Sequence, residues 1–166
     1  MQIVYYPDPV LQKRAETVDL ARPGLREFVE RMLEAMEAAH GVGLAAPQVG
    51  ESLRLFVASD TAEPADALVC INPEIRAFGP SVVMEEGCLS LPGINAPISR
   101  PEKVEMRWTD LDGERHTAEF DDLMARIVQH EFDHLEGVLF FERMTAADRI
   151  RVKADLGSFE AQYRGA

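Results

Sequence analysis

Five consecutive residues, His130-Glu131-Phe132-Asp133-His134, have the HExxH pattern. Histidines four positions apart project from one face of a helix, so both imidazoles can bind the same metal ion and leave the glutamate beside a reacting water. This arrangement suits metal-assisted hydrolysis, in which water attacks and a carboxylate moves protons. Five residues are also matched by chance, and the two histidines would then be hydrogen-bonded core residues.

A catalytic metal ion needs a third protein ligand and an open position. Cys88 lies in the sequence EEGCLS (85–90), directly after a glycine that lets the backbone approach a ligand closely. Its thiolate is therefore our preferred third ligand. A buried, unreactive thiol is the alternative, and it is the interpretation that we prefer for Cys70, which lies within the apolar run ALVCI.

Two other ligand sets stay open on these residues alone. Asp155 or Glu160 as third ligand would give an HExxH metallopeptidase. Cys70 as a fourth ligand, beside Cys88 and the two histidines, would give a closed structural zinc site in a protein without catalysis.

The stretch HGVGLAAPQ, from His40 to Gln48, is rich in glycine. It follows an expected helix and precedes an expected strand, the reverse of the order in a dinucleotide-binding fingerprint, so we exclude a nucleotide site. A helix end and a tight turn would explain these residues. Their functional interpretation is a backbone that passes close to a ligand, with the Gln48 amide directed into the site.

The HExxH residues belong to a helix expected to begin after Asp121 or Asp122 and to run to Gly137. Apolar residues cover most of its circumference, so we expect it to cross the core. Imidazoles and a carboxylate in that position would cost several kcal/mol unless they are paired or bind a cation. This context favours a metal site.

The other elements must surround this helix. Helical periodicity predicts an N-terminal helix over Pro23–His40 and a C-terminal helix after Thr145, with Val152, Leu156, Phe159 and Tyr163 on one face. Strands are expected over 53–59, 67–71 and 103–109, and the proline-rich segment 79–101 is expected to form loops and short strand pieces. We predict an α+β fold of mainly antiparallel strands around a central HExxH helix, as a single domain over 1–166.

Size and charge exclude several classes of protein. The 166 residues fit one domain, and the net charge of −12 argues against DNA and other nucleic-acid partners. There is no apolar run of membrane-spanning length and no signal-peptide pattern at the start, so we expect a cytoplasmic protein that does not enter a membrane. Two cysteines are too few for a disulfide scaffold.

The three segments GVGLAAPQ, EGCLS and HEFDH occur in this order and resemble the motifs GxGxAAxQ, EGCxS and HExDH of the peptide deformylase family. The opening YPDPVLQKRA and the spacing of the motifs are also similar, so the resemblance covers most of the chain. The expected C-terminal helix resembles that of the bacterial form of the family.

The resemblance implies removal of the formyl group from N-formylmethionine at the start of nascent polypeptides, with release of formate. It implies that Cys88, His130 and His134 hold the metal, that Glu131 is the acid and base, and that Gln48 and the Leu89 amide stabilise the oxyanion. It further implies Fe²⁺ as the physiological ion, with Zn²⁺, Ni²⁺ or Co²⁺ able to substitute.

Substrate residues are expected next to these positions. We predict that Val42, Gly43, Leu89 and Ile127 form the walls of a pocket for the methionine side chain, and that the backbone around Gly87 binds an extended peptide. Glu86 and Asp133 are expected to orient a ligand or to pair with arginine, and Arg100 and Arg126 are the candidate partners. We expect a monomer, with docking of the C-terminal helix on the ribosome as a further hypothesis.

Overall fold

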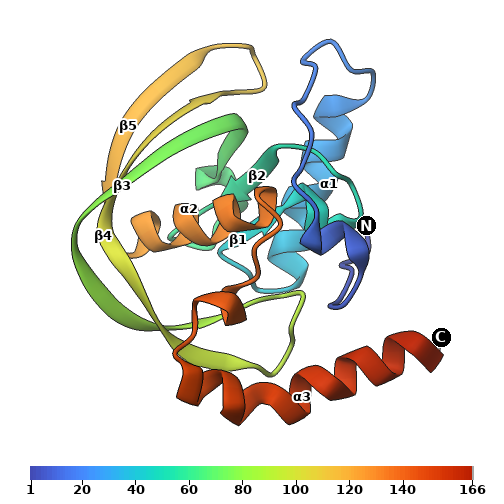
Figure 1. Cartoon of the computed structure of the whole chain (residues 1–166). Coiled ribbons are helices and arrows are strands. Elements are labelled where there is room, and N and C mark those ends of the chain that lie inside the picture. Colours follow the sequence, from blue (N-terminus) through green and yellow to red (C-terminus); the bar gives the residue numbers. More distant parts are fainter. Residues whose placement is uncertain (166) are drawn as a thin grey trace.

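A five-stranded antiparallel sheet forms the body of the protein in the computed structural model, which describes residues 1–165 (Figure 1). The strands lie in chain order: β1 (Gly43–Ala45), β2 (Leu55–Ala58), β3 (Leu68–Gly87), β4 (Asn95–Thr109) and β5 (Arg115–Asp121). The predicted α+β class is confirmed.

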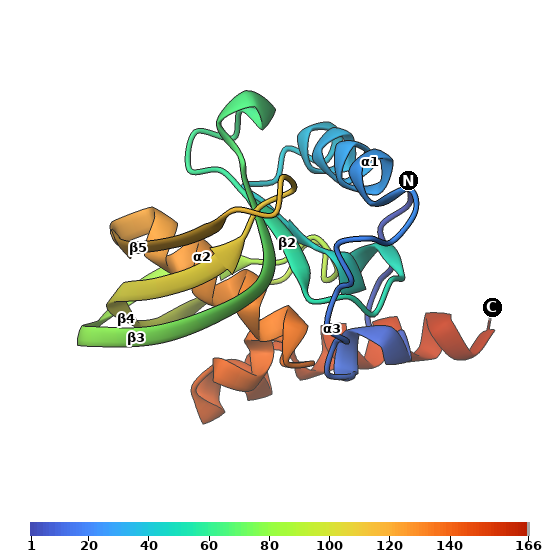
Figure 2. The same cartoon turned by 90° about the horizontal axis from the view of Figure 1, so that it is seen from above.

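Three α-helices pack around this sheet: α1 (Leu25–Ala38), α2 (Asp122–Leu135) and α3 (Ala146–Gly165). Short 3-10 helices lie at η1 (Pro9–Gln12), η2 (Ala46–Val49), η3 (Pro64–Asp66) and η4 (Phe140–Arg143). The curved sheet wraps around α2, which is the HExxH helix, while α1 and α3 lie on different sides of the molecule (Figures 1 and 2). The expectation of a central HExxH helix is confirmed.

The segment 79–101 differs from the prediction. In place of loops and short pieces it forms most of one long hairpin, in which Pro97 and Pro101 pair with β3. Here β3 and β4 form a two-stranded ribbon, because β2 pairs only with 68–71 and β5 only with 103–109. A proline tolerates such a place, since its missing N–H can face away from the partner strand.

Some boundaries also differ. Helix α1 begins at Leu25, because Gly24 adopts a left-handed conformation with φ of 75° before it. Asp121 is the residue before α2, but its side chain makes no capping hydrogen bond. In α3, Val152 is buried as predicted, whereas Tyr163 is 47% exposed and does not belong to the packed face.

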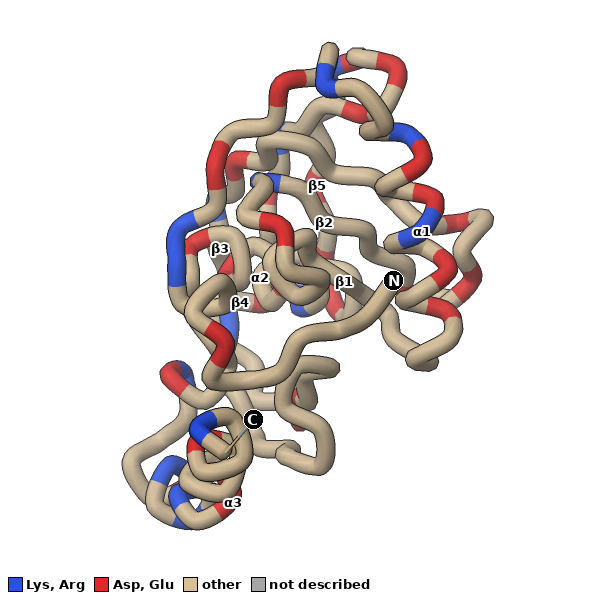
Figure 3. Tube along the Cα trace, turned by 90° about the vertical axis from the view of Figure 1, so that its right-hand side faces the viewer, with Lys and Arg blue, Asp and Glu red and all other residues tan. Residues whose placement is uncertain are grey.

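Three apolar clusters hold the site in place. One joins α2 to the sheet, a second joins α1 to β1 and β2, and a third packs η4 and α3 beneath the turn that follows Cys88. Acidic residues are spread over the molecule, and α3 carries several of the basic ones (Figure 3). Within residues 1–165 no helix is both long enough and apolar enough to cross a membrane.

Candidate functional site

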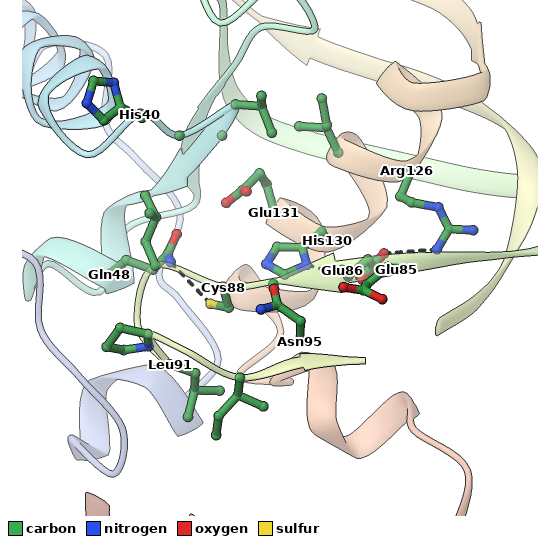
Figure 4. Close-up of a pocket in the computed structure, with 18 of the residues that line it drawn as sticks. His40, Gln48, Glu85, Glu86, Cys88, Leu91, Asn95, Arg126, His130 and Glu131 are labelled. Carbon is green, nitrogen blue, oxygen red and sulfur yellow. Dashed lines mark hydrogen bonds and ion pairs between the residues drawn. The ribbon is translucent and has the colours of Figure 1, made fainter. Parts of the chain in front are cut away.

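A cleft of about 430 Å³ opens between β1, the end of β3 and helix α2 (Figure 4). Nearly all the residues predicted from the sequence line it: Val42, Gly43, Gln48, Glu86, Gly87, Cys88, Leu89, Ile127, His130 and Glu131. His134 lies behind this wall and is 1% exposed. The three sequence motifs thus meet in one place, although they come from separate elements.

The three predicted ligands lie close together. Nitrogen atoms of His130 and His134 and the Cys88 Sγ all lie within 4.8 Å of one another. One turn of α2 separates the two histidines, and the β3–β4 hairpin brings Cys88 against them, with its Sγ 3.4 Å from His134 Nε2. Cys88 and His130 also line the cleft, so the cluster borders its open space.

The chemistry of these donors fits a divalent metal ion. Burial lowers the pKa of His134 well below its usual range, which keeps that imidazole neutral. Burial also opposes a charge on His130, but hydrogen bonds with Cys88 and Glu86 outweigh it and raise its pKa. The surroundings of His130 therefore favour a positive charge, and one thiolate with two imidazoles suits iron or zinc.

The other ligand sets considered from the sequence do not assemble. Cys70 is fully buried in the apolar cluster between α2 and the sheet, where burial raises the pKa of its thiol. Glu160 lies on α3 and accepts a hydrogen bond from the Tyr6 hydroxyl at 2.7 Å. Neither belongs to the cluster around Cys88.

Glu131 is 4% exposed, and among residues 1–165 its Oε2 has no hydrogen-bond partner. Burial is the main cause that raises its pKa, to about 7. A carboxylate with such a pKa can accept and return a proton near neutral pH. Gly43 makes room for it, because a Cβ there would lie 2.8 Å from Glu131 Cδ.

The Gln48 side chain has a fixed orientation. Its Oε1 accepts a hydrogen bond from the Ala45 N–H at 2.9 Å, which directs its Nε2 toward Ser90 Oγ at 3.3 Å. The same Nε2 lies 3.5 Å from Cys88 Sγ (Figure 4). The Leu89 N–H, one residue from Cys88, donates to no acceptor in the described part of the chain. Two neutral donors are thus available at one side of the cleft.

Buried ion pairs hold α2, the helix that carries the two candidate histidine ligands. Arg100 donates to Glu86 Oε1 at 2.6 Å and to Asp133 Oδ2 at 2.9 Å, and Arg126 donates to Glu86 Oε1 at 3.1 Å. The predicted pairing of both carboxylates with arginine is confirmed. Burial alone would raise the pKa of Glu86, but the hydrogen bonds and charges of His130 and Arg100 lower it to about 2.

Sequence reasoning missed three residues of this region. Ser90 contacts the Gln48 amide, Asn95 lines the cleft opposite Gly87, and Arg143 pairs with Asp133. Ser90 stands in the EGCLS segment, so its place in the motif was a usable signal. Nothing local in the sequence marks Arg143 or Asn95.

Comparison with known proteins decides the family. Residues 1–150 match the profile of the polypeptide deformylase family. The chain belongs to this family. The resemblance stated from the motifs is confirmed, and the peptidase and structural-zinc alternatives are not favoured.

Individual members of the polypeptide deformylase family are similar over most of the chain. Peptide deformylase of Chlorobaculum parvum is 45% identical over 93% of this chain and 85% of its own length. Peptide deformylase 1B of Arabidopsis thaliana is 40% identical over 98% of this chain, which spans 61% of that plant protein. A crystal structure of the plant protein superposes with a TM-score of 0.95 over 99% of this chain and 93% of that one.

Proposed function

We propose that this protein hydrolyses the N-formyl group of N-formylmethionine at the start of nascent polypeptides and releases formate. One observation carries the proposal: three groups lie together at one cleft. They are the buried carboxylate of Glu131, the Gln48 amide with its fixed orientation, and the Cys88–His130–His134 cluster. Membership of a metal-dependent deformylase family supports the same reaction.

The metal ion is proposed to bind Cys88, His130 and His134, with Fe²⁺ as the physiological ion and Zn²⁺, Ni²⁺ or Co²⁺ as substitutes. When bound, such an ion supplies Lewis-acid polarisation of the formyl group and activation of the attacking water. The soft sulfur and the two nitrogens suit these ions better than magnesium or calcium.

Glu131 is proposed to move the protons. It accepts a proton from the attacking water as the water oxygen bonds to the formyl carbon. It then gives that proton to the departing amine nitrogen as the carbon–nitrogen bond breaks, which leaves formate and a free N-terminal amine. Negative charge develops meanwhile on the formyl oxygen, and the Gln48 Nε2 and the Leu89 N–H are proposed to donate hydrogen bonds to it.

The methionine side chain is proposed to lie against Val42, Gly43, Leu89 and Ile127. Ile127 is one helical turn before Glu131 and, like Glu131, lines the cleft. The backbone near Glu86 and Gly87, at the end of β3, is proposed to bind the peptide in an extended conformation. Recognition by backbone predicts little preference beyond the first side chain.

The experiment compares two peptides that differ only in the formyl group. Protein purified without oxygen is expected to release formate from a formyl-Met-Ala-Ser peptide and to leave every bond of the unformylated peptide intact. Cleavage of an internal peptide bond would favour an HExxH peptidase, and no formate from metal-loaded protein would contradict the proposal.

The domain organisation, oligomeric state, location and partners of the protein are also proposals. We propose one catalytic domain over 1–166, a monomer, a cytoplasmic location and no membrane or DNA partner. The plant relative is named chloroplastic/mitochondrial, so an organelle is the alternative location. Docking of α3 on the ribosome is proposed from the basic residues Arg149, Arg151 and Lys153.

A further inference from the structure

Arg143 makes a bidentate contact with α2, the helix that carries the two candidate histidine ligands. It ends the short helix η4, and its Nε and Nη2 donate to the two carboxylate oxygens of Asp133 at 2.5 and 2.6 Å. Such a paired geometry fixes both side chains relative to one another. Asp133 directly precedes His134 and is 5% exposed.

The contact continues from Asp133 to His130. Asp133 Oδ2 also accepts from Arg100 Nη1 at 2.9 Å, and the Nε and Nη2 of Arg100 hold the two oxygens of Glu86 at 2.6 and 3.0 Å. Glu86 Oε2 lies 3.4 Å from His130 Nδ1. Four side chains, those of Arg143, Asp133, Arg100 and Glu86, thus connect η4 to the His130 imidazole.

The two buried carboxylates, Glu86 and Asp133, differ in how firmly their arginine partners are held. Glu86 is held by Arg100 and also by Arg126, which is itself anchored on the carbonyl oxygens of Val82 and Ile98. Among residues 1–165, Asp133 has Arg143 as its only charged partner besides Arg100. Without Arg143, Asp133 would keep one hydrogen bond and compete with Glu86 for the Arg100 guanidinium.

We infer that Arg143 is a positioning residue for the metal centre, acting on His130 through Asp133, Arg100 and Glu86. A carboxylate that accepts from the second nitrogen of a ligating histidine fixes the ring and its tautomer. Arg143 keeps Arg100 in the place where it orients Glu86 for that task. The inference rests on the proposed ligand set of Cys88, His130 and His134.

A purely structural role is the competing explanation. Arg143 would then only fasten η4 and α3 to α2, and its loss would lower stability while leaving metal affinity unchanged. Metal affinity of the folded protein therefore separates the two explanations, whereas thermal stability and activity alone do not.

The experiment measures Co²⁺ dissociation constants of folded protein by competition with a chelator, together with the Co²⁺ absorption spectrum. Arg143→Gln is expected to weaken Co²⁺ binding about 10- to 100-fold and to alter the spectrum. Arg143→Lys keeps the charge but loses the bidentate hydrogen bonding, so its Co²⁺ affinity should lie between that of Arg143→Gln and that of the parent. Arg26→Gln is the matched control, since it breaks an exposed ion pair with Asp112 away from the cleft and should leave affinity unchanged.

Two results would overturn the inference, and a third would overturn the ligand set on which it rests. One is a folded Arg143→Gln protein with parental Co²⁺ affinity and spectrum, and a second is equal weakening in Arg26→Gln. If Arg143→Gln does not fold, parental affinity in Arg143→Lys has the same meaning. The third is undiminished Co²⁺ binding by His130→Ala, which would instead overturn the proposed ligand set on which the inference depends.

Discussion

Gly43 on β1 and Glu131 on α2 occupy adjoining space, so that a Cβ on Gly43 would overlap the carboxylate of Glu131. The same contact brings two sequence motifs together. It explains why a residue without a side chain stands opposite the proposed acid and base. A methyl group at this position must displace either the carboxylate or the strand.

Gly43→Ala is therefore expected to lower kcat by about 10²-fold or more, the scale of a misplaced acid–base group, with metal content unchanged. Gly157→Ala is the control, because no atom lies within 4 Å of a Cβ at that helical glycine. The control should keep full activity. An activity of Gly43→Ala within twofold of the parent would show that Glu131 does not need its present position.

The orientation of Gln48 predicts a second change in rate. Gln48→Ala removes the Nε2 donor and is expected to lower kcat by about 10²- to 10³-fold, the usual effect of one lost oxyanion donor. Ser90→Ala removes only one neighbour of that amide, which stays pinned by the Ala45 N–H, so a much smaller loss is expected. Steady-state kinetics on a formylated peptide checks both, and equal losses would contradict the account of Gln48.

The two cysteines are predicted to differ completely. Cys88→Ser should lose bound metal, whereas Cys70→Ala should keep metal and activity and should lose only the packing of a buried thiol. Metal analysis of both purified variants checks this. Loss of metal from Cys70→Ala would instead favour a structural zinc site with Cys70 as a ligand.

The Tyr6–Glu160 hydrogen bond predicts a pH dependence of stability. Burial, followed by the hydrogen bond and charge of Glu160, raises the pKa of Tyr6 to about 12, against about 10 in an unfolded chain. The folded state thus holds the phenol proton more tightly, and this contribution is complete below pH 10 and is lost as pH rises toward 12.

Denaturant unfolding at pH 8, 10 and 11.5 tests this prediction. The parent is expected to exceed Tyr6→Phe in unfolding free energy at pH 8, and the difference should shrink at the highest pH. Tyr5→Phe, at a neighbouring residue that is 51% exposed, serves as control. A difference that stays constant with pH would contradict the assignment.

Local patterns were sufficient to predict the HExxH helix, and together with the family resemblance they indicated many of the residues that line the cleft, although not Asn95. The apolar positions of α2 repeat at helical spacing, and each motif holds its chemical groups within a few residues. The hairpin of β3 and β4 was not predictable in this way. Whether Pro97 and Pro101 break a strand depends on whether another strand needs their N–H groups, and that is decided by pairing far along the chain.

The contact of Arg143 with Asp133 could not be predicted for a similar reason. This contact requires the chain to turn back directly after α2, and Gly137 allows this turn with a φ of 72°. A Cβ at Gly137 would lie 2.8 Å from the backbone of Gln12, so the N-terminal segment also shapes the turn. Neither contact leaves a pattern in the sequence around Arg143.

Formate release by the parent and by Glu131→Gln, prepared without oxygen and matched in metal content, tests the proposed reaction and the role of Glu131 together. We expect release by the parent and a rate at least about 10²-fold lower in the metal-loaded variant, because the amide cannot take up and return the proton. A metal-loaded Glu131→Gln protein that releases formate at nearly the parental rate would contradict it.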